Sequence, residues 1–223
     1  MMGRLLGWLI AFVGTIIAVG ACYALVDRPV AFYAHARLSQ YGVFDALTRI
    51  SEYLAIAAVV VFVLAGLRSL VTAYWARWQR TLLLCAISLT AAENVKDELK
   101  FIFGRTWPET WIANDPSLIG NGTFGFNFFH GGAGYASFPS GHTTVVCAVV
   151  AVLWFAYPRL RPLWGLAVLA VVLGLIGADY HFVSDIVAGG FLGASSGWMT
   201  MLIADSGAFL PDNKRGGGSD FHS

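Results

Sequence analysis

Long apolar runs without a charged side chain constrain this sequence more than any other feature. Four such runs cover Leu5–Val26, Tyr53–Leu67, Leu163–Ala178 and Ile186–Ala204. About 20 apolar residues in a helix are enough to cross the hydrocarbon core of a bilayer. Only 12% of the residues are charged, against about 25% in soluble domains. We therefore expect an all-α integral membrane protein.

Two further stretches raise the prediction to six transmembrane helices. The third span begins at Thr81 and becomes polar from Glu93, and the fourth covers Thr143–Tyr157. Between them, Glu109–Phe138 is a long outer loop, rich in glycine and aromatic residues, of a length typical of functional lids. We expect a single membrane-embedded domain over residues 1–205 and a flexible polar tail over residues 206–223.

Basic residues predict the orientation of these helices, because cytoplasmic loops carry an excess of Lys and Arg. One side of the predicted bundle collects Arg4, Arg68, Arg77, Arg80, Arg159, Arg161, Lys214 and Arg215. We expect that side to face the cytoplasm and the long loop to face outside. Three arginines in the first outer segment run against this assignment, namely Arg28, Arg37 and Arg49. That segment, Asp27–Glu52, is expected to be amphipathic and interfacial.

The N-terminus, the cysteines and the net charge limit the alternatives. Met1–Arg4 followed by an apolar run also fits a signal peptide, and Val19–Cys22 resembles a lipoprotein cleavage site. The run is longer than a usual signal core, which favours a membrane helix. The odd number of cysteines, all in apolar segments, argues against a disulfide framework. The net charge of +1 gives no reason to expect a nucleic acid partner.

A polar island at Phe138–Thr144 precedes the fourth apolar run. Ser140 and Gly141 fit the start of a helix, whose backbone N–H groups and dipole can bind a phosphate. His142 falls in the first turn, within reach of an anion bound there. This island is our first candidate for a binding site.

Two more polar islands flank it. His181 and Asp185 are four residues apart at a predicted helix start, so the carboxylate can accept from one ring nitrogen and leave the other as a nucleophile. Upstream, the island Lys100–Pro108 ends an apolar helix, on which Lys96 and Lys100 share one face with Glu93. A solvated helix end with internal salt bridges is an open alternative for this charged group.

The three islands together resemble the type 2 phosphatidic acid phosphatase superfamily, which includes lipid phosphate phosphatases, bacterial acid phosphatases and vanadium haloperoxidases. Lys100, Ser140–His142 and His181–Asp185 carry the resemblance, which covers roughly residues 81–205. It implies that His181 forms a phosphohistidine and that His142 first protonates the leaving oxygen and then activates water. The groups it implies for holding phosphate are Lys100, Ser140 and Gly141. No metal or other cofactor is implied.

The sequence departs from the family pattern at two arginines. The first motif has Arg-Pro where this chain has Trp107-Pro108, and the third motif has an Arg where this chain has Leu175. A charge-assisted hydrogen bond contributes about 1.5–3 kcal/mol. Losing two without compensation would slow the reaction by about two to four orders of magnitude. Another cation is therefore expected, or a substrate that needs less charge.

Arg105 is our candidate for that cation. Gly104 suits the left-handed turn that ends helices, and such a break would let the chain fold back. We expect the Arg105 guanidinium to join the Lys100 ammonium over Ser140 and bind phosphate.

The leading hypothesis is a membrane phosphatase that hydrolyses a lipid phosphate or diphosphate monoester. It would act at the non-cytoplasmic face, in a bacterial inner membrane with its active site toward the periplasm, and its partners would be the lipid substrate and membrane lipid. The alternatives are a lipid phosphotransferase similar to sphingomyelin synthases and an inactive membrane scaffold. A metal site built from His142, Asp179, His181 and Asp185 is also conceivable. The oligomeric state is left open.

Overall fold

The computed structural model describes residues 2–71, 75–110 and 115–206. These residues form helices joined by turns and a long connection, with isolated bridges as the only β-type pairing among them. The predicted polar tail lies outside the described residues except for Ser206. The helices are α1 (Met2–Leu25), α2 (Asp27–Arg37), α3 (Val43–Ser69), α4 (Arg77–Phe103), α5 (Leu118–Asn121), η1 (Ala133–Tyr135), α6 (Gly141–Ala156), η2 (Pro158–Leu160), α7 (Arg161–Gly177) and α8 (Val183–Asp205).

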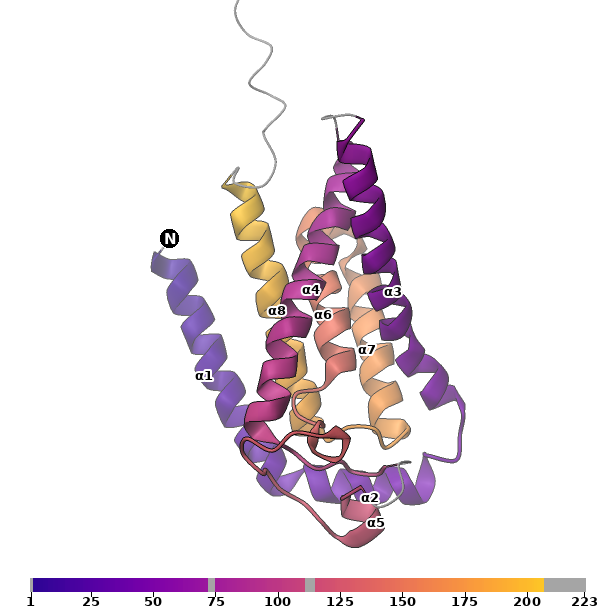
Figure 1. Cartoon of the computed structure of the whole chain (residues 1–223). Coiled ribbons are helices and arrows are strands. Elements are labelled where there is room, and N and C mark those ends of the chain that lie inside the picture. The colour runs from indigo at the N-terminus through magenta and orange to yellow at the C-terminus, as the bar shows by residue number, and fades with distance from the viewer. Residues whose placement is uncertain (1, 72–74, 111–114, 207–223) are drawn as a thin grey trace, which may run out of the picture.

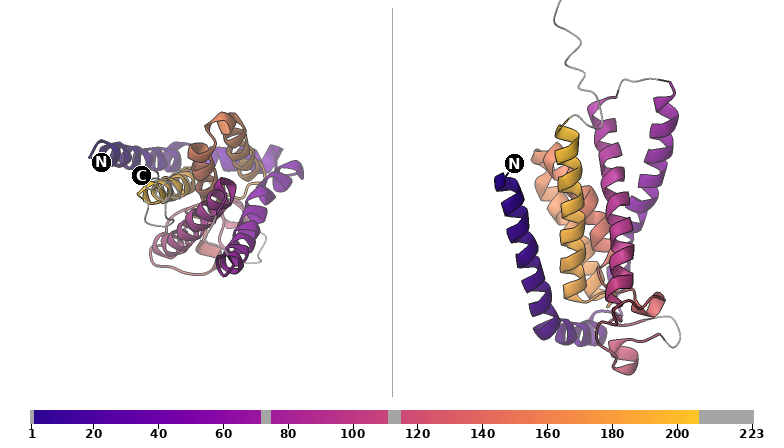
Figure 2. Two further views of the ribbon diagram at one scale, coloured as in Figure 1. Left: turned by 90° about the horizontal axis from the view of Figure 1, so that it is seen from above. Right: turned by 60° about the vertical axis from the view of Figure 1, so that its left-hand side comes forward.

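Helix α6 is the centre of an upright bundle and packs against α3, α4, α7 and α8 (Figure 1). Helix α1 runs beside α8 at the edge of the bundle, while α2 crosses beneath one end of it (Figures 1 and 2). The connection from Gly104 to Ser140, which includes α5 and η1, covers the same end. The three polar islands of the sequence meet at this covered end.

Glycines let α8 approach α6 closely. A Cβ atom placed on Gly189 would lie 2.3 Å from the Ser140 carbonyl oxygen, and one on Gly193 would lie 2.3 Å from that of Thr144. Small residues at a spacing of four allow such backbone contact between membrane helices. The backbones of α8 and α6 are therefore in close contact. This contact fixes the start of α6 against the start of α8.

Four described helices are long and apolar enough to cross a membrane, namely α1, α3, α8 and the η2–α7 segment Pro158–Gly177. Helix α6 is apolar but shorter, and α4 carries the charged residues from Glu93 to Lys100. Both pack against other helices of the bundle. The all-helical prediction is confirmed, whereas the count of six spans stays a prediction.

Two segments differ in detail from the prediction. Helix α3 runs continuously from Val43 to Ser69, so the polar stretch around Asp45 extends the second span instead of forming a separate interfacial helix. Asp45 pairs with Arg49 one turn later and accepts a 2.6 Å hydrogen bond from Tyr180, which accommodates these polar groups on the helix. Helix α2 has the crosswise position expected of an interfacial segment.

Candidate active site

The start of α6 is built as the sequence predicts. Ser140 is the N-cap residue, and its hydroxyl accepts from the Thr143 backbone N–H at 3.5 Å. The Ser140 backbone N–H donates to the Asp185 carbonyl oxygen at 3.0 Å, which links α6 to α8. The first N–H groups of a helix have no partner within the helix. Gly141 and His142 therefore begin α6 where an anion can be bound.

The two histidines come together at this end. His181 lies in the connection between α7 and α8, and its ring centroid is 5.9 Å from that of His142. His181 is 5% exposed, and burial lowers the pKa of its ring from the ordinary histidine value, although the Asp185 carboxylate acts in the opposite direction. His181 is thus held as a neutral imidazole beside a second imidazole.

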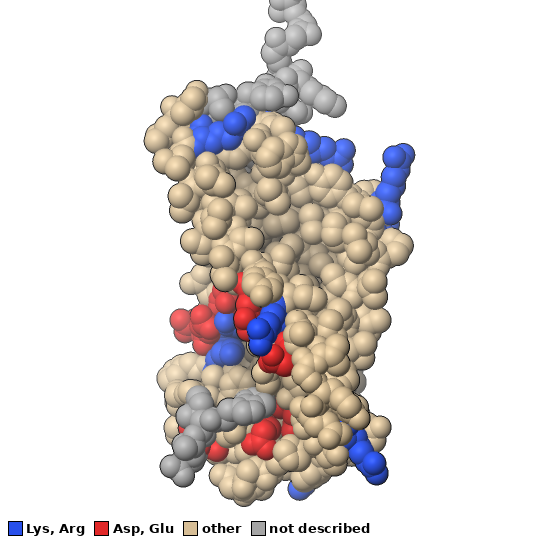
Figure 3. Space-filling view, turned by 90° about the vertical axis from the view of Figure 1, so that its right-hand side faces the viewer, with Lys and Arg blue, Asp and Glu red and all other residues tan. Residues whose placement is uncertain are grey.

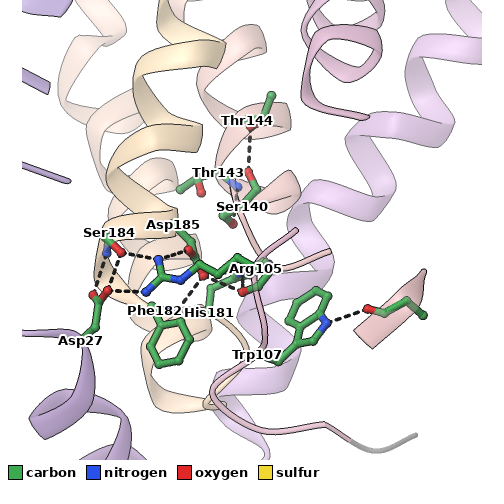
Figure 4. A network of polar contacts seen from close by, with 12 residues as sticks. Asp27, Arg105, Trp107, Ser140, Thr143, Thr144, His181, Phe182, Ser184 and Asp185 are labelled. Carbon is green, nitrogen blue, oxygen red and sulfur yellow. Dashed lines mark hydrogen bonds and ion pairs between the residues drawn. The ribbon is translucent and has the colours of Figure 1, made fainter. Parts of the chain in front are cut away.

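Asp185 is fixed from several directions (Figure 4). Its Oδ2 accepts from the Ser137 hydroxyl at 2.6 Å and from the Phe182 backbone N–H at 3.1 Å, and it lies 3.5 Å from His181 Nδ1. Its Oδ1 pairs with the Arg105 guanidinium. The carboxylate is fully buried. Because its contacts converge from three parts of the chain, Asp185 can set the orientation of the His181 ring.

Arg105 does not lie where the sequence predicts. Its side chain is completely buried, and its guanidinium pairs with Asp27 at 2.7 Å and with Asp185, instead of joining Lys100 over Ser140. Gly104 does end α4 in the left-handed conformation, with φ of 52°, but the chain then turns toward α8. Two buried carboxylates need a counter-charge. Arg105 supplies it, so its guanidinium is paired with Asp27 and Asp185, and a contact of Arg105 with phosphate stays a prediction.

Asp27 is a site residue that sequence reasoning missed. It lies at the start of α2, accepts from the Ser184 backbone N–H at 2.9 Å, and bonds the Ser184 hydroxyl and Arg105 (Figure 4). The Arg105 guanidinium lies 4.4 Å from the centre of the Phe182 ring, within range of a cation–π interaction. Asp27 directly follows the first apolar run, so its sequence position signals only a helix end. Ser137 was missed as well, because it does not stand at a recognisable spacing from the motif residues.

Lys100 faces the site across an aromatic ring. Its ammonium lies 5.7 Å from the Trp107 ring centre, and that ring lies 5.0 Å from the His181 ring. The Trp107 indole N–H donates to the Ala133 carbonyl oxygen at 2.7 Å, which anchors the ring to the connection (Figure 4). Leu175 is fully buried in an apolar cluster with Val146. Both positions where the family pattern has arginine are therefore apolar or aromatic here.

No group of three or more His, Cys, Asp or Glu side chains among the described residues could hold a metal ion. Asp179 is not gathered with Asp185; it lies 3.3 Å from His35, which also approaches Glu109 at 3.6 Å. Burial, followed by the Glu109 charge, raises the pKa of Asp179 to about 7. The four residues considered for a metal site are thus divided between two places.

Comparison with known proteins decides the family. The model of the PAP2 superfamily matches residues 80–206, more than half of the chain and all three polar islands. The chain belongs to the PAP2 superfamily. The resemblance inferred from the motifs is confirmed.

Two curated relatives of this PAP2 protein agree with that assignment. It is 35% identical over 83 residues to a lipid A 1-phosphatase of Rhizobium etli, which is 37% of this chain and 34% of that protein. A lipid A 1-phosphatase of Rhizobium johnstonii is 34% identical over 83 residues. The matched stretch spans about a third of the length of each relative.

A crystal structure of a transmembrane PAP2-type phosphatidylglycerolphosphate phosphatase from Bacillus subtilis has the same fold. Its TM-score is 0.54 at 16% identity, with 89% of this chain and 96% of that chain covered. This likeness shows the fold, and the PAP2 protein's own four apolar helices are long enough to cross a membrane.

Proposed function

We propose that this protein is a membrane phosphatase that hydrolyses the phosphate monoester of a lipid through a phosphohistidine. The observation that carries the proposal is the meeting of His142 and His181 at the start of α6, with Asp185 behind the nucleophile. The family membership and the lipid phosphatases among the relatives support the same reaction class.

The reaction requires neutral His181 and protonated His142, a form that the negative charge of a bound phosphate favours. His181 Nε2 attacks phosphorus, the bond from phosphorus to the lipid oxygen breaks, and His142 gives its proton to that oxygen. Neutral His142 then removes a proton from water, whose oxygen attacks phosphorus and breaks the N–P bond. Inorganic phosphate leaves and both histidines return to their starting states. Asp185, on the Nδ1 side of His181, stabilises the ring while it carries positive charge.

The remaining groups bind or position. Lys100, the Ser140 hydroxyl and the Gly141 N–H would hold the non-bridging oxygens, where negative charge develops. Arg105 and Asp27 act indirectly, because Arg105 contacts Asp185, and Asp27 contacts Arg105 and Ser184. Arg105 is accordingly a positioning residue in this proposal.

We place the site on the non-cytoplasmic side of a bacterial inner membrane. The opposite end of the bundle carries Arg68 at the end of α3, Arg77 at the start of α4, and the basic turn of η2 and α7, in line with the positive-inside rule. On the face of the molecule drawn in Figure 3, charged side chains of both signs gather in the lower half, and Lys and Arg side chains (blue) mark the upper end.

Cysteine labelling in intact cells tests this orientation. Thr123 is exposed at the site end and Leu70 is exposed at the other end. Thr123→Cys should react with an impermeant maleimide in intact cells, and Leu70→Cys only after lysis. The reverse pattern would invert the topology.

A substrate panel tests the activity. Purified protein should release phosphate from at least one of lipid A 1-phosphate, phosphatidic acid, phosphatidylglycerolphosphate or an isoprenyl diphosphate. Chelator should leave the rate unchanged, and vanadate, which can adopt the trigonal-bipyramidal geometry of the transition state, should inhibit. Transfer of the phosphoryl headgroup to an added alcohol, without phosphate release, would replace the hydrolase with the transferase.

A further inference from the structure

Lys96 lies beside the start of α6, one helical turn before Lys100. Lys96 is 9% exposed. A Cβ atom placed on Gly141 would lie 3.7 Å from the Lys96 ammonium nitrogen and 3.4 Å from its Cδ. The ammonium is therefore at the rim of the helix start that is proposed to bind phosphate.

Two carboxylates hold this ammonium in place. Glu93 Oε2 lies 3.0 Å and Asp97 Oδ1 lies 3.1 Å from Lys96 Nζ. An ammonium has three N–H donors, so these contacts leave one for a further acceptor. The Glu93 and Asp97 side chains are 30% and 69% exposed. They therefore contact the Lys96 ammonium from the solvent side, and Gly141 lies on its inner side.

The site lacks cations from its usual positions. Trp107 and Leu175 replace the two motif arginines, and Arg105 is neutralised by Asp27 and Asp185. The phosphate of a monoester carries close to two negative charges near neutral pH. Lys100 alone would leave this charge incompletely matched.

We propose that Lys96 is a second phosphate-binding cation, which acts with Lys100 from α4 on a phosphate seated at the start of α6. The inference rests on the proposed function, and it adds a residue outside the three motif islands. Lys96 and Lys100 together supply the positive charge that the missing arginines would carry. The ligand class is a dianionic phosphate monoester or its analogue.

Vanadate binding to the purified full chain, measured by titration calorimetry, tests this without requiring turnover. Lys96→Gln should weaken binding about tenfold to a hundredfold, as expected for one charge-assisted hydrogen bond, and Lys96→Arg should restore most of it. Glu98→Gln is the matched control, since it neutralises an exposed charge on the same helix and should leave binding unchanged.

Glu93→Gln separates phosphate binding from a purely structural ion pair. It removes a partner of Lys96 but leaves the ammonium, so binding should be unchanged or tighter. Equal weakening in Lys96→Gln and Glu93→Gln, or wild-type binding in Lys96→Gln, would overturn the inference. Should Lys96→Gln fail to fold, the double variant Glu93→Gln/Lys96→Gln is measured against Glu93→Gln, with the same two outcomes.

The failure of the proposed function has a different signature. If the wild-type protein releases no phosphate from the lipid panel, yet binds vanadate in a Lys96-dependent way, the binding inference stands and the phosphatase proposal falls. If phosphate is released and Lys96→Gln keeps both the wild-type vanadate affinity and the wild-type KM, the phosphatase stands and the role of Lys96 falls.

Discussion

Cationic side chains lie on two sides of the His181–Asp185 pair, and the two sides differ in almost every physical respect. Behind the pair, Arg105 is fully buried and is neutralised by two carboxylates. On the other side, Lys100 contacts an aromatic ring, and Lys96 lies at the start of α6 with two solvent-accessible carboxylates as partners. A cation that is already paired in a dry interior fixes geometry, whereas one that borders a binding site is available to a ligand. The charge of a residue therefore does not reveal its role without its surroundings.

Removal of Arg105 should have the largest effect on folding. Arg105→Ala leaves Asp27 and Asp185 buried without a counter-charge, which should cost about 3–5 kcal/mol of stability. Unfolding in mild detergent, followed by circular dichroism, measures it. Arg49→Ala is the control, because Arg49 forms an exposed pair with Asp45 and its loss should leave the stability nearly unchanged. Equal stability of the two variants would contradict a structural role for Arg105.

Lys100→Gln should show the opposite behaviour. Loss of one charged hydrogen bond to phosphate should lower kcat/KM by about tenfold to a hundredfold. The melting temperature should stay close to that of the wild type, since Lys100 has no carboxylate partner like those of Arg105 among the described ion pairs. Phosphate release and thermal unfolding measured on the same preparation check both parts. A variant that unfolds with its activity per folded molecule unchanged would place Lys100 with Arg105.

The pH dependence of kcat/KM tests the buried state of His181. Burial lowers the pKa of His181 in the folded protein, so the reactive neutral ring persists as pH falls below the ordinary value of about 6.5. The acid limb of the profile should therefore lie below pH 6.5. An acid limb centred above pH 6.5 would contradict this.

Replacing Asp179 should have the smallest effect on stability, and only at high pH. Its folded pKa of about 7 exceeds the unfolded value of about 3.9, so its contribution to stability is present below the unfolded pKa and is lost as pH rises through about 7. Asp179→Asn should therefore stabilise the protein by about 1–2 kcal/mol at pH 8 and by almost nothing at pH 4. Asn also tolerates the left-handed backbone at this position, where φ is 58°. Equal effects at both pH values would contradict the raised pKa.

Local features of this site could be predicted from the sequence. The left-handed turn at Gly104, the cap at Ser140 and the approach of His181 to Asp185 each depend on residues within four positions of one another. The apolar runs likewise predicted helices, because span length and composition are local properties. These are the parts of the account in which backbone geometry alone determines which groups meet.

Long-range contacts were beyond that reasoning. Arg105 meets Asp27 and Asp185 across 78 and 80 residues, and no spacing rule indicates where a chain goes after a left-handed turn. Asp27 follows an apolar run, where a charged residue also fits a plain interfacial position. The expected position of the Arg105 side chain was therefore wrong. That an arginine side chain needs polar or acidic partners can be inferred from its charge, but which partners it finds cannot.

Chemical trapping of the intermediate tests the central claim most directly. His142→Ala protein, in which hydrolysis of the intermediate is slowed, is incubated with lipid carrying a radiolabelled phosphate and quenched in alkali. The account predicts label on the protein that is stable to alkali, labile to acid, located on His181 by peptide mapping, and absent when His181 is also replaced by Ala. Label that is released by alkali, as from a carboxylate, or that persists without His181 would contradict it.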